Sequence, residues 1–400
     1  MNNEIKIHPL VQNIKDEIID NRRYFHKHPE LSFKEFNTLE VIEKKLINMG
    51  ITNITKMAKT GLIADIKGSK NGKTIGLRAD MDALPIQETS DLSFKSINDG
   101  VMHACGHDGH MAMLLGAAKI INEKKEKLNG NVRLIFQPAE EGPAGATYMI
   151  KDGALKGVDQ IYGIHLWNYQ KVGEIGVKPG PIMAAADMFE IEIHGKGGHG
   201  ATPHGTVDAI VVASNLINSL QTIVSRNTNP IESTVVTVGM INGGYNFNVI
   251  ADRVKLKGTS RSYTKKNRNI IKKRMNEIIL GLEKMYGAKI ILNYKDGYPP
   301  TINDPECANN VLSASNKIVG KGAGNPYLSM GGEDFSYYLE KIPGCFFFVG
   351  SCPLDQEPLS TPHHCSHFNI DETALLIGSS SFITLIEDLL IKYINPFITK

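Results

Sequence analysis

The chain has 400 residues, of which 42% are hydrophobic and 22% charged, a composition typical of soluble globular proteins. This length exceeds what one ordinary core supports, so we expect two domains. The formal net charge of +2 gives no electrostatic reason to expect nucleic acid or an anionic membrane as a partner.

The cysteines and the chain ends indicate the compartment. The five cysteines lack the spacing of a disulfide framework and favour a reducing environment. The N-terminus has no basic start followed by an apolar core, so no secretory signal is predicted. No uninterrupted apolar run is long enough to span a bilayer, and charged residues interrupt the apolar stretch 374–398, which predicts an amphipathic packing helix. We therefore expect a cytoplasmic protein.

The first part of the chain alternates between predicted helices and strands. Apolar spacing predicts helices over 8–22 and 35–49, the first broken by His26–Glu30 and the second ended by Gly50. The elements that follow are strands at 61–66 and 74–77, a helix at 111–122, a strand at 132–136, a helix at 145–152 and a strand at 160–164. This alternation predicts an α/β sheet.

Polar side chains follow three of these predicted strands. The first strand end carries Asp80 and Asp82, the second Glu140 and Glu141, and the third His165. Because ligand sites in open α/β sheets lie at the carboxyl ends of strands, we expect these side chains to meet at one rim.

The pattern changes near 179–181. A strand at 187–193 alternates apolar and acidic residues, as a half-solvated strand does. A helix at 206–224, strands at 233–240 and 253–259, a helix at 265–286 and a strand at 289–293 follow, which predicts an inserted α+β domain. A helix at 304–319, a strand at 345–349, the loop 351–370 and a last helix complete the chain. The predicted domains are 1–183 with 295–400, and 184–294.

The stretch 102–111 reads MHACGHDGHM and is the strongest local feature. It holds three histidines, a cysteine and an aspartate, with glycines that allow tight turns. Thiolate and imidazole are ligands that transition metals favour. A histidine-rich surface loop is the plain alternative. His165 alone would be a core histidine, and the pair His363-His364 alone is ambiguous, but one metal site explains all of these residues together.

Two rival chemistries are open on the residues alone. The stretch Gly195–Gly200 matches G-x-G-x-x-G, which would indicate an NAD-linked oxidoreductase. No acidic residue ends the following predicted strand to bind a ribose, which weakens this reading. Cys105 could instead act as a nucleophile beside a histidine. That reading leaves Glu140, Glu141 and the later histidines unexplained.

Six motifs together resemble the M20 metallopeptidase family, in particular the branch of hippurate hydrolases, N-acyl-L-amino-acid amidohydrolases and auxin-conjugate hydrolases. The resemblance covers nearly the whole chain. In order, the motifs are LRADMDALP (77–85), MHACGHDGH (102–110), FQPAEEG (136–142), GGHGA (197–201), NVI (248–250) and GTSRS (258–262).

The resemblance implies a hydrolase-like catalytic domain with a mixed sheet and an inserted ferredoxin-like lid and dimerisation domain. It also implies two divalent ions, such as zinc, manganese, cobalt or nickel, and a homodimer formed through the lid. The implied metal ligands are Cys105 as the bridge, with His107, Glu141, His165 and His364. The motif at 363–366 departs from the family pattern, so His363 competes with His364 for the last ligand.

The remaining site residues also come from the resemblance. Glu140 is implied as general base, Asp80 as the residue that orients a ligand, and His199 as the donor to the oxyanion. The implied substrate-binding residues are Asn248, Arg261 and Gly332. The expected reaction is hydrolysis of an N-acyl amino acid by metal-activated water. A carboxypeptidase or dipeptidase acting on short peptides and an N-acetyldiaminopimelate deacetylase are alternatives.

Overall fold

The structure is a computed structural model that describes residues 5–391. The described chain forms two compact units. Unit 1 contains residues 5–182, 302–328 and 334–391, and unit 2 contains 183–301 and 329–333. The predicted insert 184–294 falls inside unit 2. Residues 392–398 of the predicted last helix lie outside the described part.

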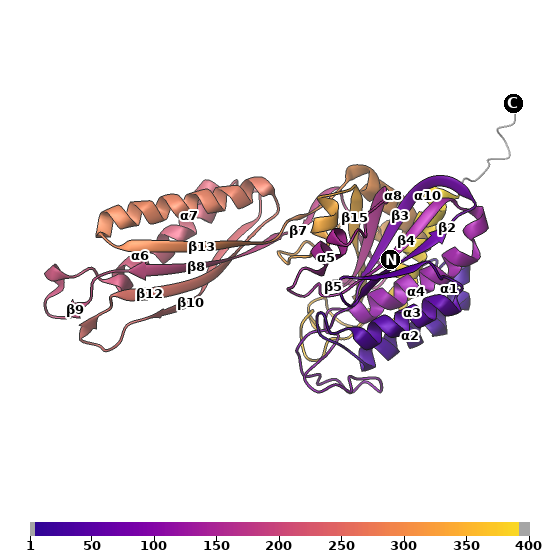
Figure 1. The fold of residues 1–400 in the computed structure, drawn as a ribbon, viewed down its shortest axis with the longest axis horizontal. Coiled ribbons are helices and arrows are strands. Elements are labelled where there is room, and N and C mark those ends of the chain that lie inside the picture. Colours follow the sequence, from indigo (N-terminus) through magenta and orange to yellow (C-terminus); the bar gives the residue numbers. More distant parts are fainter. Residues whose placement is uncertain (1–4, 392–400) are drawn as a thin grey trace, which may run out of the picture. The chain divides into compact units, whose positions relative to one another are not determined.

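Within the described residues, unit 1 is built on a mixed seven-stranded sheet in the order β1-β2-β4-β3-β5-β15-β6 (Figure 1). The four central strands β4, β3, β5 and β15 run parallel, and the outer strands pair antiparallel. This confirms the predicted α/β class with a mixed sheet. The strands are β1 (Ile54–Met57), β2 (Gly61–Lys67), β3 (Lys70–Asp80), β4 (Asn129–Gln137), β5 (Gln160–Lys171), β6 (Ile175–Gly176) and β15 (Gly344–Cys352).

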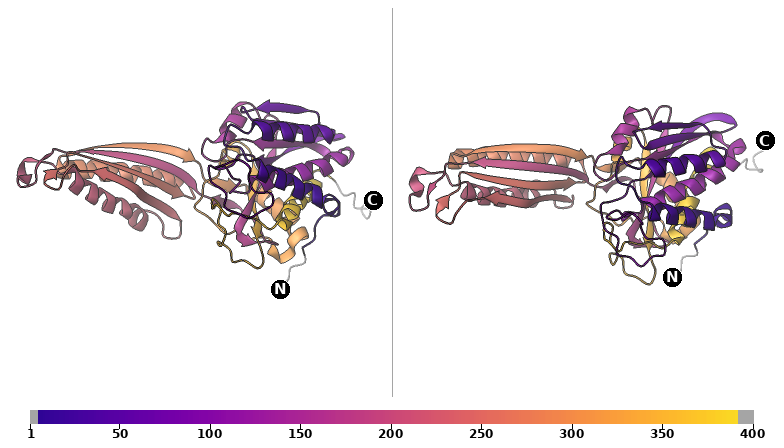
Figure 2. Two further views of the ribbon diagram at one scale, coloured as in Figure 1. Left: turned by 90° about the horizontal axis from the view of Figure 1, so that it is seen from below. Right: turned by 60° about the horizontal axis from the view of Figure 1, so that its bottom comes forward.

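Helices cover the sheet of unit 1 (Figure 2). Helices α4 and α10 pack on each other and on the central strands, and α1 and α2 pack on α4. Leu77 and Arg78 are neighbours on β3, so their side chains point to opposite faces of the sheet. Helices α5 and α9 pack together on the face of Arg78, where Asp334 binds both Arg78 and the N–H of Ala146 in α5. The helices are α1 (Pro9–Asn13), α2 (Lys15–Lys27), α3 (Phe36–Asn48), α4 (His107–Glu123), α5 (Gly145–Lys151), α8 (Pro305–Val319), α9 (Ser336–Leu339) and α10 (Thr373–Leu390), with short 3-10 segments at Lys125–Lys127 and Gly320–Gly322.

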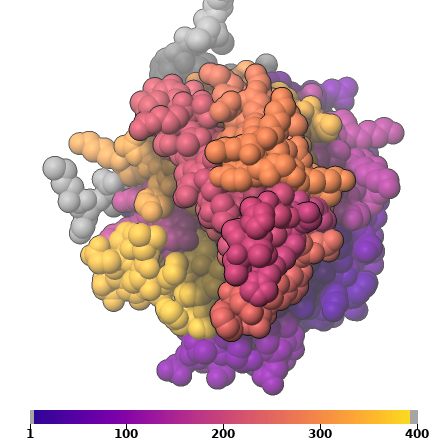
Figure 3. Space-filling view, turned by 90° about the vertical axis from the view of Figure 1, so that its left-hand side faces the viewer, coloured from indigo at the N-terminus to yellow at the C-terminus, as the bar shows by residue number. Residues whose placement is uncertain are grey.

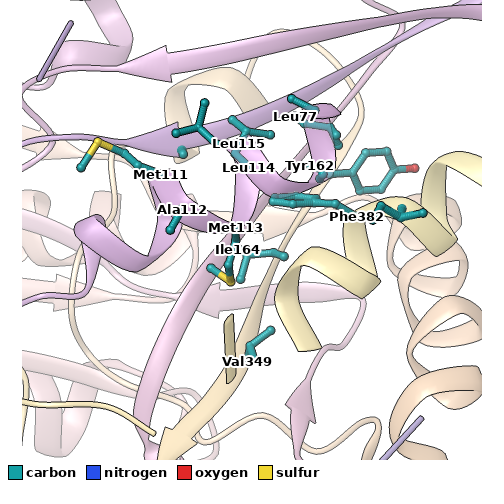
Figure 4. Close-up of a cluster of buried hydrophobic side chains, with 14 of the residues drawn as sticks. Leu77, Met111, Ala112, Met113, Leu114, Leu115, Tyr162, Ile164, Val349 and Phe382 are labelled. Atoms are coloured by element: carbon teal, nitrogen blue, oxygen red, sulfur yellow. The ribbon is translucent and has the colours of Figure 1, made fainter. Parts of the chain in front are cut away.

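The core of unit 1 lies between α4, α10 and the parallel strands (Figure 4). Leu77 of β3, Ile164 of β5 and Phe382 of α10 are among its fully buried side chains, each worth about 1.5–3 kcal/mol on burial. Helices α4 and α10 approach so closely that a Cβ on Gly378 would lie 2.0 Å from the sulfur of Met113. The core therefore holds the start of α4 firmly against the strand ends.

Helix α10 is the one helix among residues 5–391 that is long and apolar enough to cross a membrane by length and composition. Of that stretch, 72% is buried inside unit 1. This burial is what a core helix of a globular unit shows, and it agrees with the packing helix predicted from the sequence.

Unit 2 contains an antiparallel sheet in the order β10-β12-β8-β13, with α6 and α7 on one face (Figure 1). Along the chain the elements run β-α-β-β-α-β, as in ferredoxin-like folds. Whether this unit acts as a lid stays a prediction. Its elements are β8 (Ala185–His194), β9 (Gly198–His199), α6 (Ala209–Thr222), β10 (Thr234–Gly243), β11 (Val249–Ile250), β12 (Arg253–Ser262), α7 (Lys265–Tyr286) and β13 (Lys289–Tyr298), with a 3-10 turn at Pro203–Gly205 and a π-helical turn at Ile223–Asn227. Two further short strands, β7 (Gly180–Met183) and β14 (Thr301–Asn303), pair with each other.

Candidate metal centre

The carboxyl ends of β3, β4 and β5 bring the predicted polar residues to one level. Asp80 is paired with Gln137 across β3 and β4, and Arg78 with Gly163 across β3 and β5. Asp80 and His165 each lie two residues further along their strand, so they reach the same height at the edge of the sheet. The predicted end of β5 at 164 is wrong, because the strand continues to Lys171 alongside β15.

The cluster at 102–111 forms the start of α4. The helix begins at His107, earlier than the predicted residue 111, because Gly106 with φ of +100° turns the chain sharply just before it. This turn places Cys105 before the helix and His107 in its first turn. The Sγ atom of Cys105 lies 3.5 Å from Nε2 of His165.

Two groups of three side chains share Cys105. One group is Cys105, His107 and His165, and the other is Cys105, Glu141 and His364. Within each group the ligand atoms all lie within 4.8 Å of one another. Two ligands of one zinc ion lie up to about 4.6 Å apart, given metal–ligand distances of about 2.0–2.3 Å, and the limit of 4.8 Å is close to that value. The geometry therefore fits two ion positions with Cys105 between them.

Backbone carbonyl groups set the tautomers of two of these histidines. Nδ1 of His107 lies 2.8 Å from the carbonyl oxygen of Asp82, and Nδ1 of His165 lies 2.6 Å from that of Leu166. A ring that donates from Nδ1 keeps the lone pair on Nε2, which is the form that binds a metal. Nε2 of His107 is buried and has no hydrogen-bond partner among the described residues.

The other two histidines of the cluster do not offer a ligand atom in this way. Nε2 of His110 accepts the N–H of Leu166 at 2.9 Å, and its Nδ1 lies 2.6 Å from Asp80. His103 is buried, belongs to neither group, and burial lowers its pKa to about 3. Cys105 and His107 are therefore the better ligand candidates from this stretch, and His110 instead hydrogen-bonds to Leu166 and Asp80.

The adjacent histidines of the last loop have different surroundings. Nε2 of His364 lies 3.2 Å from Oε1 of Glu141, and half of its side chain is exposed. His363 packs among aromatic rings, and its Nε2 accepts the N–H of Asn168 at 3.1 Å. His364 is therefore the better candidate for the last ligand.

The turn that carries Glu140 and Glu141 is held by Asp82. The two oxygens of its buried carboxylate accept the N–H groups of Glu140 and Glu141 at 2.9 and 3.0 Å. Oδ1 also lies 3.4 Å from Nδ1 of His107. Sequence reasoning recorded Asp82 in the strand-end motif but gave it no role, because only the bend of the chain after β3 brings it under this turn.

The predicted role of Asp80 stays a prediction, although the contacts favour Asp82 for it. Its carboxylate accepts hydrogen bonds from His110 and Arg78 and lies 3.7 Å from Nε2 of His107, so it orients no proposed ligand through a hydrogen bond. Asp82 is the residue that faces the Nδ1 side of His107. Asp80 instead contributes negative charge and fixes the ring of His110.

The carboxylates around Cys105 and His107 make the site strongly negative, which favours binding of a cation. Burial lowers the pKa of His107, but Asp80, Asp82 and Glu141 outweigh burial and raise it to about 10. Burial, and then Glu141 and Glu140, raise the pKa of the Cys105 thiol well above its usual range. A nucleophilic cysteine needs a lowered pKa, so this environment disfavours Cys105 as a nucleophile. A divalent ion beside the sulfur would reverse these shifts.

The chemistry of the donor set fits two divalent ions. Besides Nε2 of His107, Oε1 of Glu141 is a buried atom without a hydrogen-bond partner among residues 5–391. Both belong to the residue groups described above. A thiolate, imidazoles and carboxylates around two positions suit zinc, manganese, cobalt or nickel.

In unit 2, two predicted site residues are neighbours. His199 of β9 is paired with Val249 of β11, and the N–H of Gly200 donates to the carbonyl of Asn248 at 2.8 Å. His199 and Asn248 are both exposed. The structure therefore presents these two polar side chains together at one end of the unit 2 sheet.

Arg261 and Gly332 lie at the other end of unit 2. Both flank Ala186: Arg261 is its partner across β12 and β8, and a Cβ on Gly332 would lie 2.8 Å from the Ala186 Cβ. Arg253, at the end near β9, is eight residues along β12 from Arg261. At about 3.3 Å per residue this separates the two ends of the strand by roughly 26 Å.

The glycine-rich stretch 195–200 does not form a dinucleotide turn. A dinucleotide fingerprint places the helix directly after the glycines, whereas α6 begins only at Ala209. A Cβ on Gly195 would lie 2.1 Å from the carbonyl oxygen of Val207, and one on Gly200 would lie 3.0 Å from that of Asn248. These glycines permit close approach of backbone segments inside unit 2.

Comparison with known proteins agrees with this geometry. A profile of peptidase family M20/M25/M40 matches residues 76–388. The chain is 44% identical over 371 residues to an N-acetyl-L-cysteine deacetylase of Bacillus subtilis (strain 168), covering 92% of this chain and 87% of that protein. It is 41% identical over 373 residues to thermostable carboxypeptidase 1 of Saccharolobus solfataricus, covering 92% and 94% of the two chains.

A solved structure is also similar. The Bacillus subtilis YXEP protein, described as a dinuclear metal-binding peptidase from the M20 family, matches with a TM-score of 0.83 and 38% identity. The match covers 94% of this chain and 99% of that chain. The similarity therefore extends over both units.

Proposed function

The chain belongs to peptidase family M20/M25/M40, and on this premise we propose that it hydrolyses the amide bond of N-acyl-L-amino acids, releasing a carboxylic acid and a free amino acid. It is a metal-dependent hydrolase that acts on amide bonds. The observation that carries the proposal is the pair of ligand groups sharing Cys105, with Glu140 beside Glu141 at the same turn. The deacetylase relative supports an acyl group on the amino nitrogen of an amino acid.

Five side chains would hold two divalent ions. His107 and His165 would complete one position with Cys105, and Glu141 and His364 the other. When bound, such ions lower the pKa of water from about 15.7 to near 7 and neutralise developing negative charge.

Glu140 would move the proton. Its side chain is buried, and its Oε1 lies 3.3 Å from the N–H of Asp334. It would take the proton of the attacking water and pass it to the nitrogen of the departing amino acid as the amide bond breaks. Its neighbour Glu141 faces His364, so the two carboxylates of this turn would serve different purposes.

Residues of unit 2 would bind the substrate. The guanidinium of Arg261 suits a carboxylate because it can donate two parallel hydrogen bonds. It is half-buried and already donates to the hydroxyl of Thr259 and the carbonyl of Ser260, which fixes its position. His199 is an exposed donor suited to a developing oxyanion, and Asn248 lies beside it.

The separation within unit 2 supports a site completed by a second copy. With roughly 26 Å between the two ends of β12, Arg261 and His199 of one chain are too far apart to contact the same small substrate. We therefore propose a homodimer in which His199 and Asn248 act in the partner's site.

The end of unit 2 that carries β9, which faces the viewer in Figure 3, also exposes apolar side chains. Phe247 is 98% exposed and Tyr245 is 71% exposed, and β10 is an edge strand of its sheet among the described residues. Large exposed apolar groups on a sheet edge are typical of a protein interface. The exposed apolar residues here are Ile210, Val211, Met240, Ile241, Tyr245, Phe247 and Val249.

A carboxypeptidase or dipeptidase activity on short peptides is the second candidate, favoured by the carboxypeptidase relative. Both activities would use the same metals and the same base. A cytoplasmic location would suit the free thiols and a small-molecule substrate.

The test of the proposed function is elemental analysis followed by a hydrolysis panel of N-acetyl amino acids, N-benzoyl amino acids, N-acetyldiaminopimelate and dipeptides. Two ions per chain with preferred release of acetate or benzoate supports the amidohydrolase, and preferred cleavage of dipeptides supports the peptidase.

A further inference from the structure

The segment between α2 and α3 packs against the turn that carries Glu140. Its last residue, Glu35, is fully buried. Oε1 of Glu35 accepts the N–H of Ala139 at 2.9 Å, and Oε2 accepts the hydroxyl of Thr60 at 2.5 Å. A carboxylate from a distant part of the chain thus contacts the residue that precedes the proposed base.

This contact acts on a backbone conformation that needs support. Ala139 has φ of +56°, in the left-handed region that side chains other than glycine adopt at a cost. Its N–H and those of the next two residues all point to carboxylates: Glu35 takes the first and Asp82 takes the other two. Successive N–H groups arranged in this way form a concave anion-binding surface. Two buried side chains therefore determine how the turn is bent.

We propose that Glu35 is a positioning residue for hydrolysis, which fixes the Pro138–Glu141 turn so that the carboxylate of Glu140 points at the reacting atoms. The proposal rests on the function proposed above. The side-chain hydrogen bonds of Glu35 come from Ala139 and Thr60 and not from a proposed ligand, so it acts through Ala139. Asp82 holds the same turn from the strand-end side, and Glu35 holds it from the α3 side.

The hydrogen bond from Ala139 does not depend on the charge of Glu35. Burial is the largest influence and raises the pKa of Glu35 to about 7, while the hydrogen bond from Thr60 lowers it. In either protonation state an oxygen is left to accept the N–H. A glutamine at this position keeps such an oxygen, whereas an alanine leaves the buried N–H of Ala139 without an acceptor. This difference separates positioning from simple loss of charge.

The experiment compares Glu35→Ala and Glu35→Gln in the full-length, metal-loaded protein. In Glu35→Ala we expect kcat to fall about 100-fold, the effect of misplacing a reacting group by about 1 Å, with KM within about twofold. Metal content should stay at two ions per chain, and amide hydrogen exchange should increase at 139–142. Glu35→Gln should restore kcat to within about threefold of the wild type. The matched control is Glu387→Gln, which removes a carboxylate on α10 that pairs with Lys124, far from the turn along the chain.

Several outcomes would overturn the proposal. The first is a kcat within twofold of wild type in folded Glu35→Ala. The second is a loss of kcat that parallels a loss of bound metal, and the third is a Glu35→Gln variant whose kcat stays as low as that of Glu35→Ala. Should Glu35→Ala not fold, Glu35→Met fills similar space without an acceptor for the N–H of Ala139 and decides the question: a lowered kcat at unchanged metal content supports positioning, and an unchanged kcat refutes it. If the wild-type protein hydrolyses no N-acyl amino acid or peptide, the proposed function fails instead, and the exchange data at 139–142 still report whether Glu35 holds the turn.

Discussion

The two adjacent histidines of the last loop should respond oppositely to replacement. His364 reaches toward Glu141 and is half exposed, whereas His363 is enclosed by rings and accepts a backbone N–H from Asn168. We predict that His364→Ala loses metal and keeps stability, and that His363→Ala keeps metal and loses stability.

The magnitudes follow from these contacts. His363→Ala leaves the N–H of buried Asn168 unpaired and removes a packed ring, at a cost of about 3 kcal/mol, or roughly 5 °C in Tm for a unit of this size. His364→Ala removes an exposed side chain, which changes the stability of the metal-free protein by about 0.5 kcal/mol or less. Metal affinity at its position should fall at least about 100-fold, because even groups that only support a ligand are worth 10–100-fold.

The assay is elemental analysis after dialysis, together with thermal unfolding of the metal-free proteins. Residue 364 has φ of +68°, so His364→Gly is measured alongside to exclude backbone strain as the cause of metal loss. Two ions in His364→Ala, or one ion in His363→Ala at an unchanged Tm, would refute this assignment of the last ligand.

Three other predictions follow from the same structure. Glu140→Gln should retain two ions and lose about 100- to 10,000-fold in kcat, and a near-normal rate would remove it as the base. His199→Ala should lose rate without losing metal. Mixing it with Glu140→Gln should restore about a quarter of the wild-type activity, because half of the randomly formed dimers would contain one intact site out of two. No recovery after subunit exchange would place His199 in its own chain's site. For stability, the hydrogen bond from His8 and the pairing with Lys124 lower the pKa of Glu387 to about 2. Its contribution is therefore complete above pH 4.5 and is lost as pH falls toward 2. The wild type should lose about 3 kcal/mol more than Glu387→Gln over that window, as measured by urea unfolding between about pH 2 and 6.

The secondary structure was most predictable where one face of an element meets solvent. Helix α7 has the bounds expected from its apolar spacing, and the alternation along 187–193 predicted the half-buried strand β8. Errors occurred where polar residues are buried for function. His165 and Asn168 predicted a strand end, but β5 continues because β15 pairs with it over this stretch. Strand order could not be predicted, because it depends on contacts between segments far apart in the chain.

The candidate site was predictable in its residue types and not in its internal support. Cysteine, histidine and glutamate next to strand ends indicate a metal centre without a structure. The preference for His364 over His363 depends on which ring accepts the N–H of Asn168, and that requires the fold of the loop. The contact of Glu35 with Ala139 joins residues 104 positions apart, with no local sequence pattern to indicate it.

The proposed ligands are supported in two different ways, and the difference follows from where each one lies. His107 and His165 are buried at the sheet rim, and each is oriented by a backbone carbonyl that the adjacent structure fixes. Glu141 and His364 lie on a turn and a loop and are partly exposed, and their turn is bent by carboxylates from other segments. A backbone carbonyl cannot be removed by substitution, whereas a side-chain carboxylate can. The half of the centre around His107 and His165 is therefore tied to the folding of the sheet itself, and the half around Glu141 depends on individual side chains such as Asp82.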